Sequence, residues 1–190
     1  MKQFFLWAVV LSALCSSCET ADETFLEENN NAHYATAKHS GEWNDYEVYQ
    51  NIVNTFVYDT QQTYQENLTR FEQHVNFLMA DEEYASIDFK QLRLLENAGE
   101  HFVEQLSYSA PTKEAIYGIL NRSFDPETMT LPGNEQERRL IQTLFALHSK
   151  GDGDDDKLND NRTIAFAYGA QYSLAQAVLY AGAVELRRYQ

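Results

Sequence analysis

The fold follows from residues 163–190, TIAFAYGAQYSLAQAVLYAGAVELRRYQ, which carry no charged side chain from residue 163 to residue 184. Small side chains recur at every fourth position of this stretch, and a row of bulky side chains runs beside them. The small ones are Ala165, Gly169, Ser173, Ala177 and Ala181. A helix without a polar face is buried on most sides, and a row of small residues lets a second helix approach closely. We therefore predict one long buried helix over residues 163–189, at the centre of a bundle.

A transmembrane helix is the alternative interpretation of the same stretch, because 22 uncharged residues are enough to span a bilayer. The stretch is only weakly apolar, however. It contains two Gln and three Tyr, and Ala predominates over Leu. This composition favours the core of a protein over a membrane span.

Helical periodicity also marks most of the chain before this stretch. Apolar residues recur there at spacings of three and four in four segments, and no segment shows the alternation that is typical of a strand. The four segments are residues 45–79, with a break near Thr60, 88–106, 111–120 and 134–147. The sequence thus predicts an all-α fold, a single helical bundle with a long buried C-terminal helix, over residues 43–190.

Two of these segments begin with a pattern that is typical of helix N-termini. Asn44 is followed three residues later by Glu47, and Asn134 is followed at the same spacing by Glu137. In such a capping box the two side chains bond to each other's backbone amides. Both pairs are therefore predicted to start a helix.

An acidic run, SKGDGDDDKLNDN, occupies residues 149–161 between the last two predicted helices. Its carboxylates alternate as the oxygen ligands of a calcium loop do, with one more at the ninth loop position. They are Asp152, Asp154, Asp156 and Asp160. Lys157 stands where an EF-hand needs glycine, and Thr163 stands where it needs a bidentate glutamate. Two interpretations stay open: a calcium site, and a solvated loop in which Asp160 or Asn161 caps the next helix.

The charge balance limits the partners that the protein can have. With 14 basic and 29 acidic side chains, the chain has a formal net charge of −15. Such a charge repels nucleic acid and anionic lipid head groups, so neither is expected as a partner. The chain also has 12 Tyr, a residue that suits interfaces because it combines a large contact area with a polar tip. We expect a basic protein or peptide as the partner.

The chain begins with MKQFFLWAVVLSALCSSC, which contains its two cysteines, Cys15 and Cys18. A redox C-x-x-C pair requires a folded helix N-terminus, and a zinc site requires further Cys or His ligands close by. The sequence around the pair offers neither, and a disulfide would close only a tiny loop. A positive start at Lys2, an apolar run over residues 4–14 and small residues at a processing site are typical of a secretory signal.

This segment resembles the signals of bacterial lipoproteins, in which a small residue precedes a cysteine that is acylated and becomes the mature N-terminus. Ser16 and Ser17 precede Cys18, whereas Leu14 precedes Cys15. The resemblance covers the first 18 residues only. It implies lipid attachment at Cys18 and a lipid-anchored location in the bacterial cell envelope. A plain secretory signal that is cleaved without lipidation is the alternative.

The next segment, residues 19–42, has the composition of a tether. Its sequence, ETADETFLEENNNAHYATAKHSGE, contains six acidic residues and a triple Asn but no hydrophobic period. A flexible coil of this length reaches about 25 to 30 Å on average, enough to hold a domain clear of a membrane. The sequence is compatible with the periplasmic face and with the outer face of the envelope.

Few residues form a pattern that is associated with catalysis. His101 and Glu104, one helical turn apart, are a candidate pair for a site built by several helices. The sequence has no G-x-S-x-G elbow, no phosphate-binding glycine loop and no cysteine after Cys18. It predicts a non-catalytic domain that binds another macromolecule, as an adaptor, an inhibitor or an immunity-type protein does, without a cofactor. The alternative is a metal-dependent enzyme or a calcium-stabilised domain that uses the acidic loop at residues 152–160.

Overall fold

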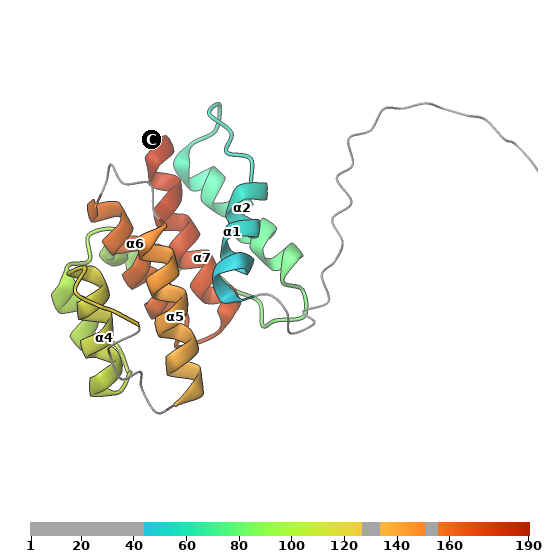
Figure 1. The fold of residues 1–190 in the computed structure, drawn as a ribbon. Coiled ribbons are helices and arrows are strands. Elements are labelled where there is room, and N and C mark those ends of the chain that lie inside the picture. The colour runs from blue at the N-terminus through green and yellow to red at the C-terminus, as the bar shows by residue number, and fades with distance from the viewer. Residues whose placement is uncertain (1–43, 127–133, 151–155) are drawn as a thin grey trace, which may run out of the picture. The chain divides into compact units, whose positions relative to one another are not determined.

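The computed structural model describes residues 44–126, 134–150 and 156–190, all of which belong to one compact unit. Every regular element in these ranges is a helix, and no strand occurs in them. The predicted all-α bundle is therefore confirmed (Figure 1). In chain order the helices are α1 (Asp45–Thr55), α2 (Tyr64–Leu78), α3 (Phe89–Leu95), η2 (Glu100–Gln105), α4 (Ala110–Leu120), α5 (Glu135–Ser149), α6 (Asp156–Gly169), α7 (Leu174–Glu185) and η3 (Leu186–Tyr189).

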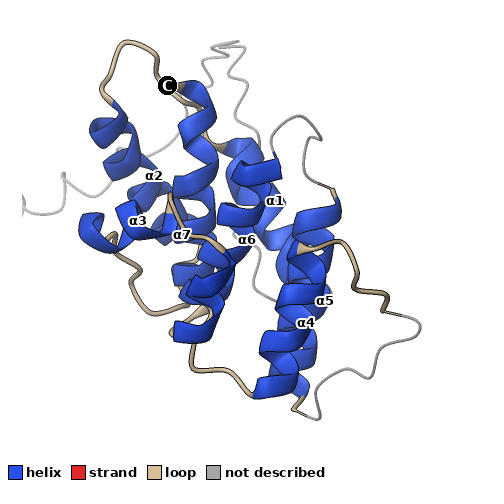
Figure 2. Cartoon of the chain, turned by 90° about the vertical axis from the view of Figure 1, so that its left-hand side faces the viewer, coloured by secondary structure: helices blue, strands red, loops and turns tan. Residues whose placement is uncertain are grey.

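Helix α7 lies at the centre of the packing. Ten of its 12 residues are buried, and it contacts α1, α2, α3 and α6. In Figures 1 and 2, α7 runs between α6 and α2. Its small side chains permit this close packing. At Gly182, for example, an added Cβ would lie 2.3 Å from Cζ of the Phe71 ring on α2. The predicted central position of the C-terminal segment is confirmed for this helix.

The C-terminal segment is not the single long helix that the sequence predicted. It forms two helices, α6 and α7, joined by a turn at residues 170–173. Ser173 starts α7, because its side chain accepts a hydrogen bond of 3.0 Å from the backbone amide of Gln176. The prediction was wrong because four-residue periodicity reports which side chains share a face. It does not report where the local hydrogen bonds end a helix.

Gly169 lets the two helices meet directly beside this turn. A Cβ atom at Gly169 would lie 2.4 Å from the carbonyl oxygen of Gln176 and 2.5 Å from Cα of Ala177. Both are backbone atoms, which cannot move aside as the tip of a flexible side chain can. The small residues Gly169 and Ala177 thus face each other across a hairpin, where the sequence had placed them along one face of one helix.

We expect Gly169→Ala to lower the free energy of unfolding by about 1 to 3 kcal/mol, because the added methyl group overpacks the contact between α6 and α7. Chemical denaturation measures this difference. Gly99→Ala is the matched control, since its Cβ would approach only the exposed side chain of His101, at 2.8 Å from Cε1. Equal losses in the two variants would contradict the close backbone contact.

Within the described ranges, no helix combines the length and the hydropathy that a membrane span requires. The uncharged stretch that raised the membrane alternative is divided between α6 and α7. Its large apolar side chains lie in the protein core, where Ile164, Phe166 and Leu179 are at most 1% exposed. The core interpretation of this stretch is confirmed.

The break predicted near Thr60 separates α1 from α2. Asn44 and Glu47 form the predicted capping box, and Thr63 and Glu66 form a second one at the start of α2. The predicted helix over residues 88–106 is also interrupted, because α3 ends at Leu95 and the chain continues as the 3₁₀ helix η2 after Gly99.

Glu137 joins α5 to α4, a role that differs from the capping box predicted with Asn134. The Asn134 side chain caps α5 through the backbone amide of Gln136, at 2.9 Å. The Glu137 carboxylate instead accepts hydrogen bonds from the backbone and hydroxyl of Ser109 and from the hydroxyl of Thr112. It thereby supplies the acceptor at the N-terminus of α4, where the Ser109 side chain makes no cap of its own.

We expect Glu137→Gln to destabilise the protein by about 1 kcal/mol at pH 7, through loss of charge-assisted hydrogen bonds. Burial alone would raise the pKa of Glu137, but the hydrogen bonds from Ser109 and Thr112 bring it below its usual value. A lowered carboxyl pKa stabilises the fold above the ordinary pKa, and this stabilisation is lost as the pH falls through the lowered value.

The difference between wild type and Glu137→Gln should therefore shrink between pH 7 and pH 3 in urea unfolding. Glu135→Gln, an exposed change in the same first turn of α5, is the control and should have little effect at either pH. A Glu137→Gln difference that stays constant down to pH 3 would contradict the role of the ionised carboxylate.

Candidate functional site

Tyrosine rings from α6, from α7 and from the turn between them gather near the N-terminal end of α7. The ring of Tyr168 packs edge-on against those of Tyr172 and Tyr180, with centroids 5.5 and 5.3 Å apart. The ring of Phe102 also packs edge-on against Tyr168, with centroids 6.2 Å apart. Tyr180 is buried beneath the others, whereas Tyr172 is 65% exposed. The cluster therefore has a fixed base and an open aromatic edge.

The loop before α3 extends this cluster across the surface. Gln176 exchanges two hydrogen bonds with the backbone of Ser86, and the Tyr180 hydroxyl accepts one from the backbone amide of Asp88. These contacts hold Tyr84, which is 69% exposed, in the same part of the molecule. We call this surface the tyrosine face, and define it as Tyr84, Tyr168, Tyr172, Glu72 and Asp88.

Carboxylates lie beside Tyr84, one of the exposed rings of the tyrosine face. Glu72 accepts a hydrogen bond of 3.2 Å from the Tyr84 hydroxyl, and its charge raises the pKa of Tyr84 above the ordinary value. Three further exposed carboxylates, of Asp81, Glu82 and Glu83, directly precede Tyr84. Aromatic faces attract guanidinium and ammonium groups, and carboxylates bind them by charge-assisted hydrogen bonds. The tyrosine face thus has the chemistry to hold lysine and arginine side chains.

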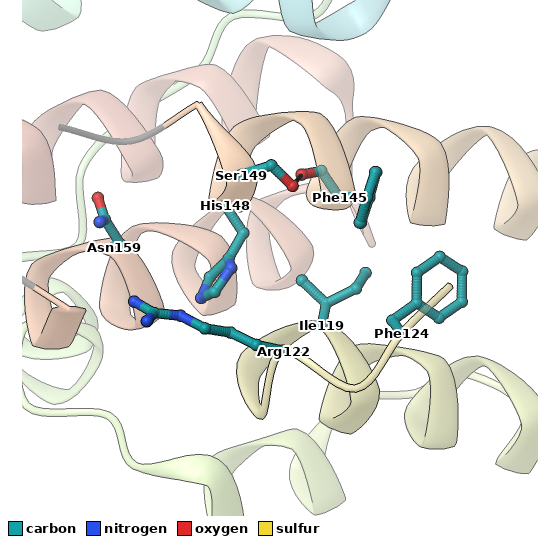
Figure 3. A pocket seen from close by; sticks show the side chains of 7 residues that line it. All are labelled: Ile119, Arg122, Phe124, Phe145, His148, Ser149 and Asn159. Carbon is teal, nitrogen blue, oxygen red and sulfur yellow. Dashed lines mark hydrogen bonds between the residues drawn. The ribbon is translucent and has the colours of Figure 1, made fainter. Parts of the chain in front are cut away.

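A cavity of about 310 Å³ lies between the end of α4 and the helices α5 and α6 (Figure 3). One end is apolar, with the rings of Phe124 and Phe145, and the other end is polar. At the polar end, Arg122 terminates α4 with a φ of 56°, in the left-handed region that non-glycine residues seldom adopt. The cavity is lined by Ile119, Arg122, Phe124, Phe145, His148, Ser149 and Asn159.

His148 lines the polar end of this cavity. Its Nε2 lies 3.0 Å from a carboxylate oxygen of Asp160, and only 7% of its side chain is exposed. The neighbouring Ser149 hydroxyl donates to the carbonyl of Phe145, at 2.6 Å, within its own helix. Ser149 is therefore engaged within its helix and not by His148, so the two side chains do not form a nucleophile–base pair in this structure.

A buried ion pair closes the hairpin of α6 and α7 at the end opposite the tyrosine face. Arg162 and Glu185 are 5% and 6% exposed, and Nη1 of Arg162 lies 2.7 Å from the Glu185 carboxylate. Nη2 donates to the carbonyl of Leu147, near the end of α5, at 2.8 Å and to the side chain of Asn159 at 3.0 Å. Glu185 also pairs with Arg188. One guanidinium thus joins α5, α6 and α7, and it satisfies a carbonyl at a helix C-terminus.

The predicted site residues fall into two groups. Cys18, Asp152 and Asp154 lie outside the described residues, as does the side chain of Asp156. Asp160 lies inside α6, where its carboxylate meets His148 instead of capping a helix. The calcium site stays a prediction. Among the described side chains, no group of three His, Cys, Asp or Glu residues is arranged to hold a metal ion.

The candidate pair His101 and Glu104 lies on η2. Glu104 accepts a hydrogen bond of 2.9 Å from the hydroxyl of Tyr117, and its backbone carbonyl accepts one from Lys113. His101 is exposed. These contacts attach η2 to α4, so the structure gives Glu104 a packing role.

Arg162 and Glu185 were missed by the sequence analysis, although the sequence contains a signal for them. They are the charged residues that border the uncharged stretch 163–184, and their charges are opposite. In one long helix they would lie at opposite ends. Once the stretch is folded as a hairpin, the two ends come together and the pair forms.

Comparison of the chain with models of protein families, with curated proteins and with solved structures finds no match.

Proposed function

We propose that this protein is a lipid-anchored protein of the bacterial cell envelope whose helical domain binds a basic protein or peptide and catalyses no reaction. It would act as an adaptor, an inhibitor or an immunity-type protein. The tyrosine face is the observation that carries this proposal. It presents two exposed rings, one of which is supported by a buried aromatic base and the other of which lies beside carboxylates, in a chain with a net charge of −15.

The physical advantages of such a surface concern both affinity and rate. Tyr84 and Tyr172 offer contact area at a low cost in conformational entropy, because tyrosine is semi-rigid and Tyr172 is supported by Tyr168. The negative field speeds the encounter with a cationic partner. Salt shortens the range of that field to about 8 Å at physiological ionic strength, so association should be salt-sensitive.

Binding should be weakened at least about tenfold when Tyr84→Ser and Tyr172→Ser are combined, because two exposed aromatic contacts for lysine and arginine are lost. The full chain is used to capture proteins from envelope extracts, and the affinity of the captured protein is then measured at 0.1 M and 0.5 M salt. We expect a basic protein whose affinity falls with salt.

The control for this experiment is Tyr189→Ser, which removes a 54% exposed tyrosine from η3, at the other end of α7. It should leave binding unchanged. Capture of an acidic protein, or of a basic protein that binds the double variant as well as the wild type, would contradict the proposal. So would turnover of a small substrate by the purified protein.

The lipid anchor is proposed on the basis of the sequence of the first 18 residues. We expect metabolic labelling with a fatty acid to mark the wild type and Cys15→Ala but not Cys18→Ala, because Cys18 is the acceptor. Cys15 is a close control, being a cysteine only three residues away. Label that persists in Cys18→Ala, or that is lost in Cys15→Ala alone, would place the lipid elsewhere.

A further inference from the structure

The cavity of about 310 Å³ between the end of α4 and the helices α5 and α6 is accessible from solvent (Figure 3). We call it the α4 cavity. Arg122 and Ser149, which line its polar end, are exposed. Phe124 and Phe145 form the apolar end, with ring centroids 5.7 Å apart. Sites for small molecules have volumes from about 300 Å³ upward and combine apolar walls with a few polar groups, so the α4 cavity has the size and the surface of such a site.

A tight turn after α4 builds both ends of the α4 cavity. The backbone amide of Arg122 donates to the carbonyl of Ile119, at 3.0 Å. The amides of Ser123 and Phe124 both donate to the carbonyl of Gly118, at 2.8 and 2.9 Å. The first two bonds form the Schellman motif, in which a chain reverses at the end of a helix. The reversal places Phe124 against Gly118, where an added Cβ would lie 3.3 Å from Cβ of Phe124.

Arg122 occupies the position of this motif that glycine usually takes. The position requires the left-handed conformation, and the φ of Arg122 is 56°. This conformation costs free energy in any residue with a Cβ. Backbone atoms make the hydrogen bonds of the turn, so glycine would form them equally well. The Arg122 side chain extends toward His148 and Asn159 at the polar end of the cavity (Figure 3). Strained residues of this kind cluster at ligand sites.

The polar end of the α4 cavity has a positive formal charge. Arg122 supplies a permanent charge, and the described residues that line the cavity include no carboxylate. A guanidinium has five N–H donors in a planar fork, so it can keep one partner and still bind a carboxylate. A monoanion fits better than a dianion, because a chain with a net charge of −15 repels every further negative charge on a ligand.

We infer that the α4 cavity binds a small monocarboxylate with an apolar body. The carboxylate accepts hydrogen bonds from the Arg122 guanidinium, and the apolar group packs against Phe124 and Phe145. A cavity of about 150 Å³ can hold benzene, so the α4 cavity has room for a ring with a short acidic tail. The site is independent of the proposed function, because the exposed rings of the tyrosine face, Tyr84 and Tyr172, do not line it.

The test is isothermal titration of the full chain with 3-phenylpropionate, at an ionic strength fixed with sodium chloride. We expect a dissociation constant below about 1 mM, which is a modest affinity for a ligand of this size. Two analogues separate the contributions of its parts. 3-Phenylpropanamide keeps the shape without the charge, and propionate keeps the carboxylate without the ring. Each should bind at least about tenfold more weakly than 3-phenylpropionate.

Arg122→Gly is the decisive variant, because it removes the guanidinium and suits the left-handed turn. It should bind 3-phenylpropionate at least about tenfold more weakly while its Tm is no lower than that of the wild type. Arg122→Gln, which keeps a Cβ in the turn, should weaken binding to the same degree. The matched control is Arg138→Gln, an exposed change on α5, which should leave binding unchanged. The combined Tyr84→Ser and Tyr172→Ser variant should also bind normally.

Three outcomes would overturn the inference. The first is the absence of binding at ten times the expected dissociation constant. The second is equal affinity for 3-phenylpropionate and its amide, which would mean that the cavity selects for shape alone. The third is wild-type affinity in both Arg122 variants, which would mean that the guanidinium serves the fold and that the carboxylate binds elsewhere.

Discussion

The structure depends on the direct contact between the backbones of α6 and α7 at Gly169. Because the turn brings these two helices together, α7 can be surrounded by other helices without leaving a gap on the α6 side. The same hairpin brings the two ends of an uncharged stretch into register, so that Arg162 meets Glu185. A buried ion pair is seldom a large net source of stability, because both charges lose their hydration. Here it fixes the pairing of the hairpin and anchors the end of α5.

The charges of the protein are unevenly distributed over its surface, which the net charge alone does not reveal. Carboxylates dominate the described surface around Tyr84, where they suit a cationic partner. At the far end of α7, a cavity of about 160 Å³ has the opposite formal charge, because its charged lining residues are Lys150, Arg162, Arg188 and Glu185. A single helix therefore separates two electrostatic environments. Gln176, near the start of α7, lies on the side of the tyrosine face, and Glu185, its last residue, lies on the opposite side. The residues between them belong to the core.

Features that depend on residues close together in the sequence were predicted better than contacts between residues far apart in it. The capping box of Asn44 and Glu47 and the break near Thr60 were correct, because the interactions that decide them lie within a few residues. The turn at Ser173 was missed, since helix and hairpin share the same spacing of small residues. Glu137 was predicted to pair with Asn134, whereas its partners, Ser109 and Thr112, lie at the start of another helix. The tyrosine face was not foreseen as a site either, because the loop at residues 84–88 reaches α7 across about 90 residues of sequence.

The central position of α7 has a consequence for the order in which the chain takes shape. A ribosome makes α1 to α5 before it makes the helix against which α1, α2 and α3 pack. Those helices carry apolar faces that have no complete core until the last α-helix arrives. The nascent chain should therefore stay open around α1, α2 and α3 until α7 has been made. A secretion channel that accepts only unfolded polypeptide would receive it in a suitable state. A premature stop codon before α7 would leave α1, α2 and α3 without the helix against which they pack.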